Sequence, residues 1–142
     1  MTIAQALKEK NKKIAGIQKI WEKIHRYNSV QEGAERPYST KDLYLQAERE
    51  LASLVELKTR IHSASAPVRT LVFELSELKA LVQRVRSVST ANGTWREKYE
   101  NITTVMNAEL DILWQDDKVE KIENRIDSIQ EKLDTFNHTT EI

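Results

Sequence analysis

Three histidines, His25, His62 and His138, are the side chains best suited to bind a metal ion in this chain, which contains no cysteine. Glu22 and His25 form a Glu-x-x-His pair, and this spacing occurs in the di-metal centres of four-helix bundles. Such a centre requires a second pair and two further glutamates, and the sequence has no second Glu-x-x-His pair. We therefore predict no metal site and interpret the pair as a surface contact between neighbouring helix turns.

Other patterns that support catalysis or cofactor binding are also missing from the sequence. A nucleophilic serine of the hydrolase type needs a G-x-S-x-G turn, and phosphate-binding loops need closely spaced glycines. The chain has only three glycines, and they are far apart. We therefore expect no enzymatic activity and no cofactor.

The segment 28–37 is the strongest candidate for a binding site, because it is a polar loop with a distinctive composition. Loops held by rigid elements often carry the residues that bind partners. The alternative is an ordinary capped turn between two helices, in which Gly33 and Pro37 serve only to reverse the chain. The candidate site residues in this loop are Asn28, Gln31 and Glu32.

Charge is balanced over the whole chain but not along it. The 22 basic and 22 acidic residues cancel, so no net field draws the protein to nucleic acid. Residues 1–30 carry seven Lys or Arg against two acidic residues, whereas residues 108–142 carry four against ten. We interpret this asymmetry as a sign that the first and last helices lie side by side, within one chain or between two. The alternative is that both helices are simply solvated.

The elements that position these residues are predicted to be long helices. Hydrophobic residues recur every three or four positions and turn residues are scarce, which is typical of an all-α chain. We predict antiparallel helices that form coiled-coil-like hairpins or a helical bundle within one domain, residues 1–142. The predicted helices span residues 2–28, 40–62, 67–88 and 117–137, with an irregular segment over residues 89–116.

Helix caps and the irregular segment add detail to these boundaries. In the irregular segment, the spacing of Trp95 and Tyr99 favours a short helix, whereas residues 110–114 suit an extended strand. The expected N-caps are Thr2, Ser39 and Asp117.

The apolar stripe of each predicted helix is narrow, like the seam of a coiled coil. The stripe of the helix predicted over residues 40–62 contains Tyr44, Ala47, Leu51, Leu54, Lys58 and Ile61. A helix with such a stripe buries it best against one or two long neighbours, so we expect the chain to form a homo-oligomer. The expected oligomer seam lies on the first and last helices and contains Ile14, Ile17, Trp21, Ile126, Ile129 and Leu133.

The sequence gives no sign of a membrane or secretory destination. Residues 1–30 lack the layout of a signal peptide, because lysines interrupt any apolar run. No window approaches the 18 consecutive apolar residues of a membrane-spanning helix. We therefore expect a cytoplasmic protein without a membrane partner.

The loop motif Val30-Gln31-Glu32-Gly33, the Ser- and Ala-rich break after residue 61 and the terminal run Asn137-His138-Thr139-Thr140 together resemble the septicolysin family of small bacterial helical proteins. That family has tryptophan at the position of His138. The resemblance implies a helical fold without an established function, and the family name implies a cytolysin. It adds to the candidate site the residues His62, Asn137 and Thr139.

Three functional hypotheses follow from these observations. The first, which we prefer, is a non-enzymatic, oligomeric interaction or scaffold module with an unidentified protein partner. The second is a cytolysin-like protein that acts on membranes, suggested by the family name alone; the densely charged outer faces of the helices argue against it. The third is a weak nucleic-acid binder that uses the lysines of the first helix, which we expect to be neutralised within the protein instead.

Overall fold

The computed structural model describes residues 1–96 and 101–142, and over these residues the protein is mostly α-helical with one small two-stranded sheet. The predominantly helical fold predicted from the sequence is therefore confirmed. In chain order the elements are α1 (Ile3–Tyr27), α2 (Thr40–Ala64), a short 3₁₀ helix (Ala66–Val68), α3 (Arg69–Ser87), β1 (Gly93–Arg96), β2 (Thr103–Met106) and α4 (Ile112–Thr139).

These elements form two compact units. The first unit contains Met1–Pro67 together with Thr135–Ile142, and the second unit contains Val68–Asp134. The single domain over residues 1–142 stays a prediction, because compact units need not fold independently.

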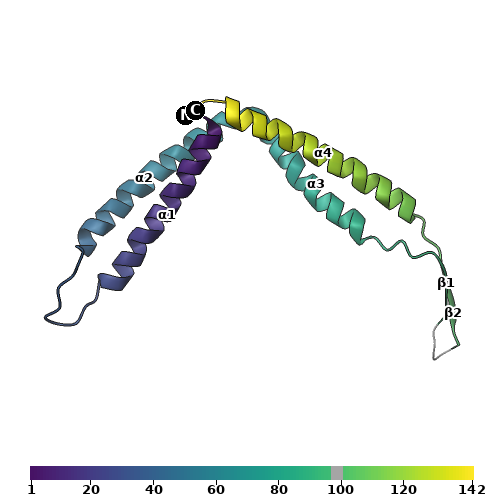
Figure 1. Ribbon diagram of the computed structural model, residues 1–142, viewed down its shortest axis with the longest axis horizontal. Helices are drawn as coiled ribbons and strands as arrows, with labels where there is room; N and C mark the ends of the chain where they lie inside the picture. Colours follow the sequence, from purple (N-terminus) through teal and green to yellow (C-terminus); the bar gives the residue numbers. More distant parts are fainter. Residues whose placement is uncertain (97–100) are drawn as a thin grey trace. The chain divides into compact units, whose positions relative to one another are not determined.

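The first unit is built on a hairpin of α1 and α2, which lie side by side (Figure 1). Thr2 caps α1, because its hydroxyl accepts a hydrogen bond from the Gln5 backbone N–H at 3.2 Å, and the Gln5 side chain accepts one from the Thr2 N–H at 2.9 Å. Ser39 caps α2 by accepting a hydrogen bond from the Asp42 N–H at 3.3 Å. Both predicted caps are confirmed, and they satisfy N–H groups that the helices leave unpaired.

The stripe predicted from the sequence is only partly buried in this hairpin. In α1, Trp21 belongs to the predicted stripe and remains exposed, whereas Ile20 lies beside the stripe and is buried against Leu43 and Ala47 of α2. In α2, Leu51 of the stripe is likewise exposed. Part of the predicted stripe stays exposed because the hydrophobic residues cover a broader face than one neighbouring helix can bury.

The two ends of the chain meet in the first unit, where the N and C marks of Figure 1 lie together. The Ile3 N–H donates to the Thr140 carbonyl at 2.9 Å, and the Ile142 N–H donates to the Met1 carbonyl at 3.0 Å. The amino group of Met1 also contacts a carboxylate oxygen of Glu141 at 2.6 Å. The neighbour along the length of α1 in this unit is therefore α2, and α4 contributes only residues 135–139. The pairing of the first and last helices between chains stays a prediction.

In the second unit, α3 and α4 lie side by side (Figure 1). Arg125 of α4 donates from Nε and Nη2 to the two carboxylate oxygens of Glu74 of α3, at 2.8 and 3.0 Å. The side-chain nitrogen of Gln115 donates to the carbonyls of Val85 and Val88, each at 2.9 Å, and so joins α4 to the end of α3, where the Val85 carbonyl also accepts from the Val88 N–H at 3.2 Å. The most deeply buried residues of α3 and α4 are Val82, Val85, Ile129 and Leu133.

The segment predicted to be irregular contains a pair of antiparallel strands. The register of β1 and β2 places Gly93 opposite Met106 and Arg96 opposite Thr103. Trp95 lies in β1, so the predicted short helix is wrong there, whereas Tyr99 lies outside the described residues. Threonine and valine in β2 favour the pleated conformation, which explains the difference.

The last helix begins earlier than predicted. It starts at Ile112, because Asp111 provides a cap by accepting a hydrogen bond from the Trp114 N–H at 2.8 Å. The extended conformation predicted for residues 110–114 is therefore wrong from residue 112 onward. The predicted cap, Asp117, lies inside α4 and pairs with Lys121 at 3.0 Å.

Candidate interaction face

The loop between α1 and α2 is held in place by an arginine. The Arg36 guanidinium donates from Nε to the Tyr27 carbonyl at 3.2 Å and from Nη2 to the Asn28 carbonyl at 3.1 Å. These carbonyls belong to the end of α1, where the helix has no further N–H groups to bind them. Arg36 thus joins the far side of the loop to the helix that precedes it.

A tight turn at the tip of this loop presents the predicted site residues to solvent. The Ala34 N–H donates to the Gln31 carbonyl at 3.0 Å, and Gly33 has a φ of 83°. That positive φ is the conformation that a type II turn requires at its third residue, and it favours glycine. The side chains of Gln31 and Glu32 are exposed. Their role in binding stays a prediction.

Aromatic contacts fix the end of the loop against α1. The rings of Tyr27 and Tyr38 lie 5.5 Å apart between centroids, and the Lys23 ammonium lies 4.6 Å from the centroid of the Tyr38 ring. A cation at this distance is attracted by the face of the ring. The start of α2 is therefore positioned by side-chain contacts as well as by its cap.

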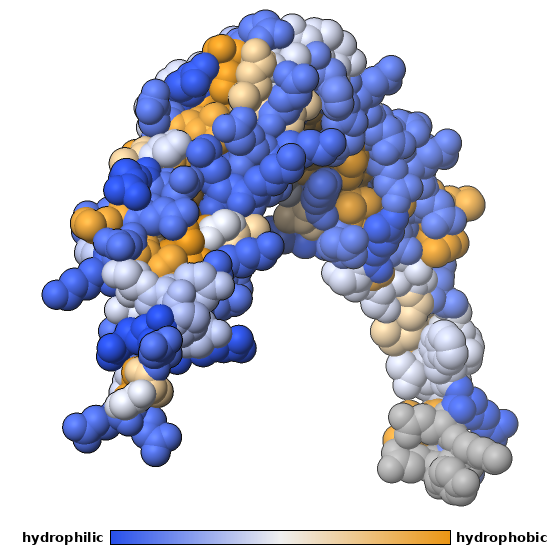
Figure 2. Space-filling model, turned by 60° about the vertical axis from the view of Figure 1, so that its left-hand side comes forward, coloured by the Kyte–Doolittle hydropathy of each residue, from blue (hydrophilic) through white to orange (hydrophobic). Residues whose placement is uncertain are grey.

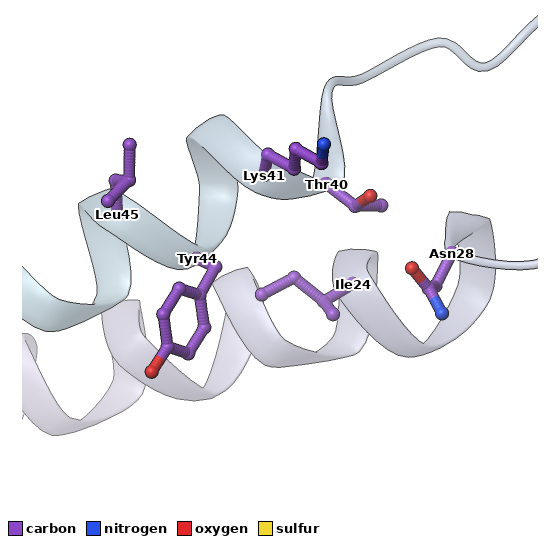
Figure 3. A pocket seen from close by; sticks show the side chains of 6 residues that line it. All are labelled: Ile24, Asn28, Thr40, Lys41, Tyr44 and Leu45. Carbon is purple, nitrogen blue, oxygen red and sulfur yellow. The ribbon is translucent and has the colours of Figure 1, made fainter.

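A cleft of about 520 Å³ opens beside this loop, between the last turn of α1 and the first turns of α2. In Figure 3, the side chain of Tyr44 extends from α2 toward α1 and lies beside Ile24, whereas Leu45 points away from α1. Asn28, one of the predicted site residues, lines the cleft. The lining residues are Ile24, Asn28, Thr40, Lys41, Tyr44 and Leu45.

The phenol of Tyr44 stays protonated at neutral pH. A hydrogen bond with Glu48 and the negative charge of that carboxylate raise the pKa of Tyr44 above its ordinary value of 10.0. The cleft therefore offers a neutral hydroxyl, an amide and an ammonium group at the rim of a mostly apolar surface. Such a surface suits an apolar partner better than an anionic substrate.

The cleft is the end of a longer apolar surface on the first unit, which we call the hairpin face. Ile14 and Trp21 contribute to it from α1, and they are 44% and 38% exposed. Tyr44, Leu51 and Val55 contribute from α2, and they are 47%, 54% and 57% exposed. The rings of Trp21 and Tyr44 meet edge to face, with 6.1 Å between centroids, which places the two helices' exposed stripes on the same side of the hairpin. Figure 2 shows apolar patches among hydrophilic side chains on the surface of the α1–α2 hairpin.

The remaining residues of the predicted oligomer seam are distributed differently. Ile17 is half-buried beside the hairpin face, and Ile126 of α4 is half-buried as well. Ile129 and Leu133 are 0% and 7% exposed within a single chain, so they are not available to a partner in this conformation. Only the α1 part of the predicted seam therefore belongs to the hairpin face.

The six predicted site residues do not form one site. Asn28, Gln31 and Glu32 lie at the loop end of the α1–α2 hairpin. His62 lies in the last turn of α2, and Thr139 donates its hydroxyl hydrogen to the Thr135 carbonyl at 2.8 Å, at the end of the hairpin where the chain termini meet. Asn137, also in this terminal part of the first unit, is half-buried.

The sequence reasoning assigned Tyr44 and Leu51 to a buried seam and did not recognise them as part of an exposed face. The sequence shows that these residues are aromatic and aliphatic. It does not show which side of α2 packs against α1. The second unit carries further exposed apolar residues on β1, β2 and the start of α4. They include Trp95, Val105 and Leu113.

His25 of the Glu22–His25 pair lies next to Trp21 in the structure. The His25 ring lies 5.9 Å from the Trp21 ring, so His25 borders the hairpin face. Across residues 1–96 and 101–142, no group of three His, Asp or Glu side chains is arranged to hold a metal ion. Within the same residues, no helix combines the length and the apolar character needed to cross a bilayer.

The candidate site is thus an exposed apolar face of a helical hairpin with a cleft at its loop end. Comparisons of the chain with known protein families, with curated proteins and with solved structures find no match.

Proposed function

We propose that this protein is a non-enzymatic helical interaction module of the cytoplasm that assembles with further copies of itself. The observation that carries the proposal is the imbalance between buried and exposed apolar residues. Among the described residues, 12 hydrophobic residues are buried, whereas 19 large hydrophobic side chains are exposed. Monomeric proteins rarely expose contiguous apolar patches larger than a few hundred Å², and such patches commonly mark sites of protein association.

The surface area of the chain supports the same proposal. Two compact units of half the mass each would together expose roughly 9,100 Å², whereas this chain of 16.5 kDa exposes 10903 Å². The excess, roughly 1,800 Å² for each chain, is larger than the roughly 800 Å² that each partner buries in a standard stable interface. Association through the apolar surface would therefore cover a large part of this excess.

A helical bundle completed by several chains is the form of assembly that we favour. The exposed residues of the hairpin face recur along α1 and α2 at heptad distances, from Ile14 to Trp21 and from Tyr44 to Leu51. That repeat is typical of helices that pack against other helices. The loop and tail motifs further support a relationship to the septicolysin family, which we retain as a proposal.

The test is the mass of the full-length protein in solution. Multi-angle light scattering or sedimentation equilibrium is expected to give a multiple of 16.5 kDa that falls toward 16.5 kDa on dilution. A particle of 16.5 kDa over the whole range from low to high micromolar concentration would refute self-association. The same preparation should release no dye from liposomes at micromolar protein, and release would favour a membrane-acting function instead.

A further inference from the structure

We propose that the hairpin face binds the hairpin face of a second copy of the chain, with α1 of each copy lying on α2 of the other. This inference rests on the proposed self-association and specifies its surface and orientation. The face is defined above by Ile14, Trp21, Tyr44, Leu51 and Val55, all exposed in the single chain. A second hairpin would convert this single layer of two helices into a four-helix bundle with a core between the layers.

The dimensions of the face suit a dimer. Each helix has 25 residues, which gives a length of about 37 Å, and two adjacent helices are about 20 Å wide. The footprint is therefore roughly 750 Å² on each copy, close to the roughly 800 Å² per partner of a standard stable interface. Trp21 and Tyr44, toward the loop end of the face, belong to the residue types that most often dominate binding.

Charge selects between the two symmetric ways of stacking the hairpins. The helix α1 carries seven Lys or Arg against two Glu, whereas α2 carries four basic and four acidic residues. A two-fold axis across the hairpins would place α1 on α1, two helices of net charge +5. A two-fold axis along the hairpins places α1 on the neutral α2 of the other copy instead. Repulsion between like charges therefore disfavours the first arrangement and leaves the second.

The contacts inside one hairpin fix which residues would meet in that arrangement. The pairs Trp21–Tyr44, with centroids 6.1 Å apart, and Lys13–Glu50, at 3.7 Å, show which positions of α1 and α2 lie at the same height. One heptad from Trp21 toward the N-terminus is Ile14, and one heptad from Tyr44 toward the C-terminus is Leu51. Because α1 and α2 run in opposite directions, Ile14 and Leu51 lie at the same position along the hairpin. A two-fold axis along the hairpins leaves that position unchanged, so Ile14 would contact Leu51 of the partner subunit.

Single-cysteine variants test this pairing, because the chain has no cysteine of its own. The full-length variants Ile14→Cys and Leu51→Cys are mixed, allowed to exchange subunits and oxidised. We expect a disulfide-linked species of twice 16.5 kDa from the mixture, and much less from either variant alone. A crosslink from Ile14→Cys alone that equals or exceeds that of the mixture would instead indicate α1 on α1 and would overturn the proposed orientation.

A charge substitution with a matched control tests the surface itself. Leu51→Asp places a carboxylate in the proposed interface, whereas Ala52→Asp places one at the next position, about 100° around the helix on the exposed outer side. Leu51→Asp should weaken association roughly 100-fold or more, because a carboxylate is costly to bury without a partner. Ala52→Asp should change it by less than about threefold. Circular dichroism of both variants checks that the helices remain folded.

The outcomes separate this inference from the proposed function. If the wild type associates and Leu51→Asp associates equally well, the hairpin face is not the interface, although the proposed self-association still stands. A wild-type protein that is monomeric at all concentrations would overturn both.

Discussion

Replacing Leu51 and Leu54 of α2 with alanine, one at a time, compares the exposed and the buried side of the same helix. Leu54 is 9% exposed and Leu51 is 54% exposed. A leucine-to-alanine change removes three carbon atoms, and at about 0.8 kcal/mol for each buried CH₂ group the loss at Leu54 is about 2.4 kcal/mol before any cavity is counted. With the cavity term, the cost at Leu54 is about 2–5 kcal/mol. At Leu51, where about half of the side chain is already in water, the cost is about 1 kcal/mol.

The assay is urea unfolding of each full-length variant, followed by far-ultraviolet circular dichroism at two protein concentrations. At low concentration, where the single chain predominates, the free energy of unfolding should fall more for Leu54→Ala than for Leu51→Ala. At high concentration the cost of Leu51→Ala should rise toward that of Leu54→Ala, because a second chain then covers Leu51.

Two results would contradict this reasoning in different ways. Equal costs at low concentration would mean that Leu51 is as deeply buried as Leu54 in the single chain. A cost at Leu51 that does not change with concentration would mean that self-association leaves this part of the hairpin face uncovered.

Three further substitutions test local contacts. Hydrogen bonds from Arg125 hold the pKa of Glu74 below its ordinary value of 4.5, so the pair stabilises the fold above that pH and its contribution is lost as the pH falls below it. Thermal unfolding at pH 7 and at acid pH should therefore show a smaller acid-induced loss in Glu74→Gln than in the wild type. Thr2→Ala removes the cap of α1 and should cost about 1 kcal/mol in urea unfolding. Gln115→Ala leaves the Val85 and Val88 carbonyls without this donor and should cost about 1–2 kcal/mol, together with faster amide exchange at the end of α3.

The helices themselves could be predicted from the sequence, because their signals are local. Thr2 and Ser39 precede apolar repeats and cap the helices that follow them, as expected. The start of α4 was predicted too late because two aspartates compete for the role of cap. Asp111 is followed at once by apolar residues, which looked extended, and only the hydrogen bond to the Trp114 N–H identifies it as the cap.

The two strands could not be predicted with the same methods. Their pairing joins Gly93 to Met106 across an intervening segment, and a stretch of four residues on each side is too short to show a reliable alternation. Trp95 fits a helix as well as a strand when only its spacing to other aromatic residues is considered. The register that decides the question is a non-local property.

Most of the candidate site escaped prediction for a related reason. The loop residues Asn28, Gln31 and Glu32 were chosen for their polar character, yet Arg36 and Gly33 account for the conformation of that loop as a turn. Only Asn28 takes part in the cleft. Ile14 and Trp21 of the hairpin face had been assigned to the oligomer seam, whereas Val55 had not been assigned to any stripe. A repeat in the sequence cannot show which edge of an apolar stripe the neighbouring helix covers.

The partial burial of the stripe also explains why self-association and stability should be linked. A layer of two helices can bury only the edges that face each other, and a stable domain normally requires a second layer over the remaining apolar surface. The first unit also contains residues 135–142, and these bond to the first residues of the chain and to Arg60 of α2, at the end of the hairpin away from its loop. If a second chain supplies the missing layer, association stabilises the folded state by mass action. The temperature of unfolding should then rise with protein concentration in the wild type and remain constant in Leu51→Asp.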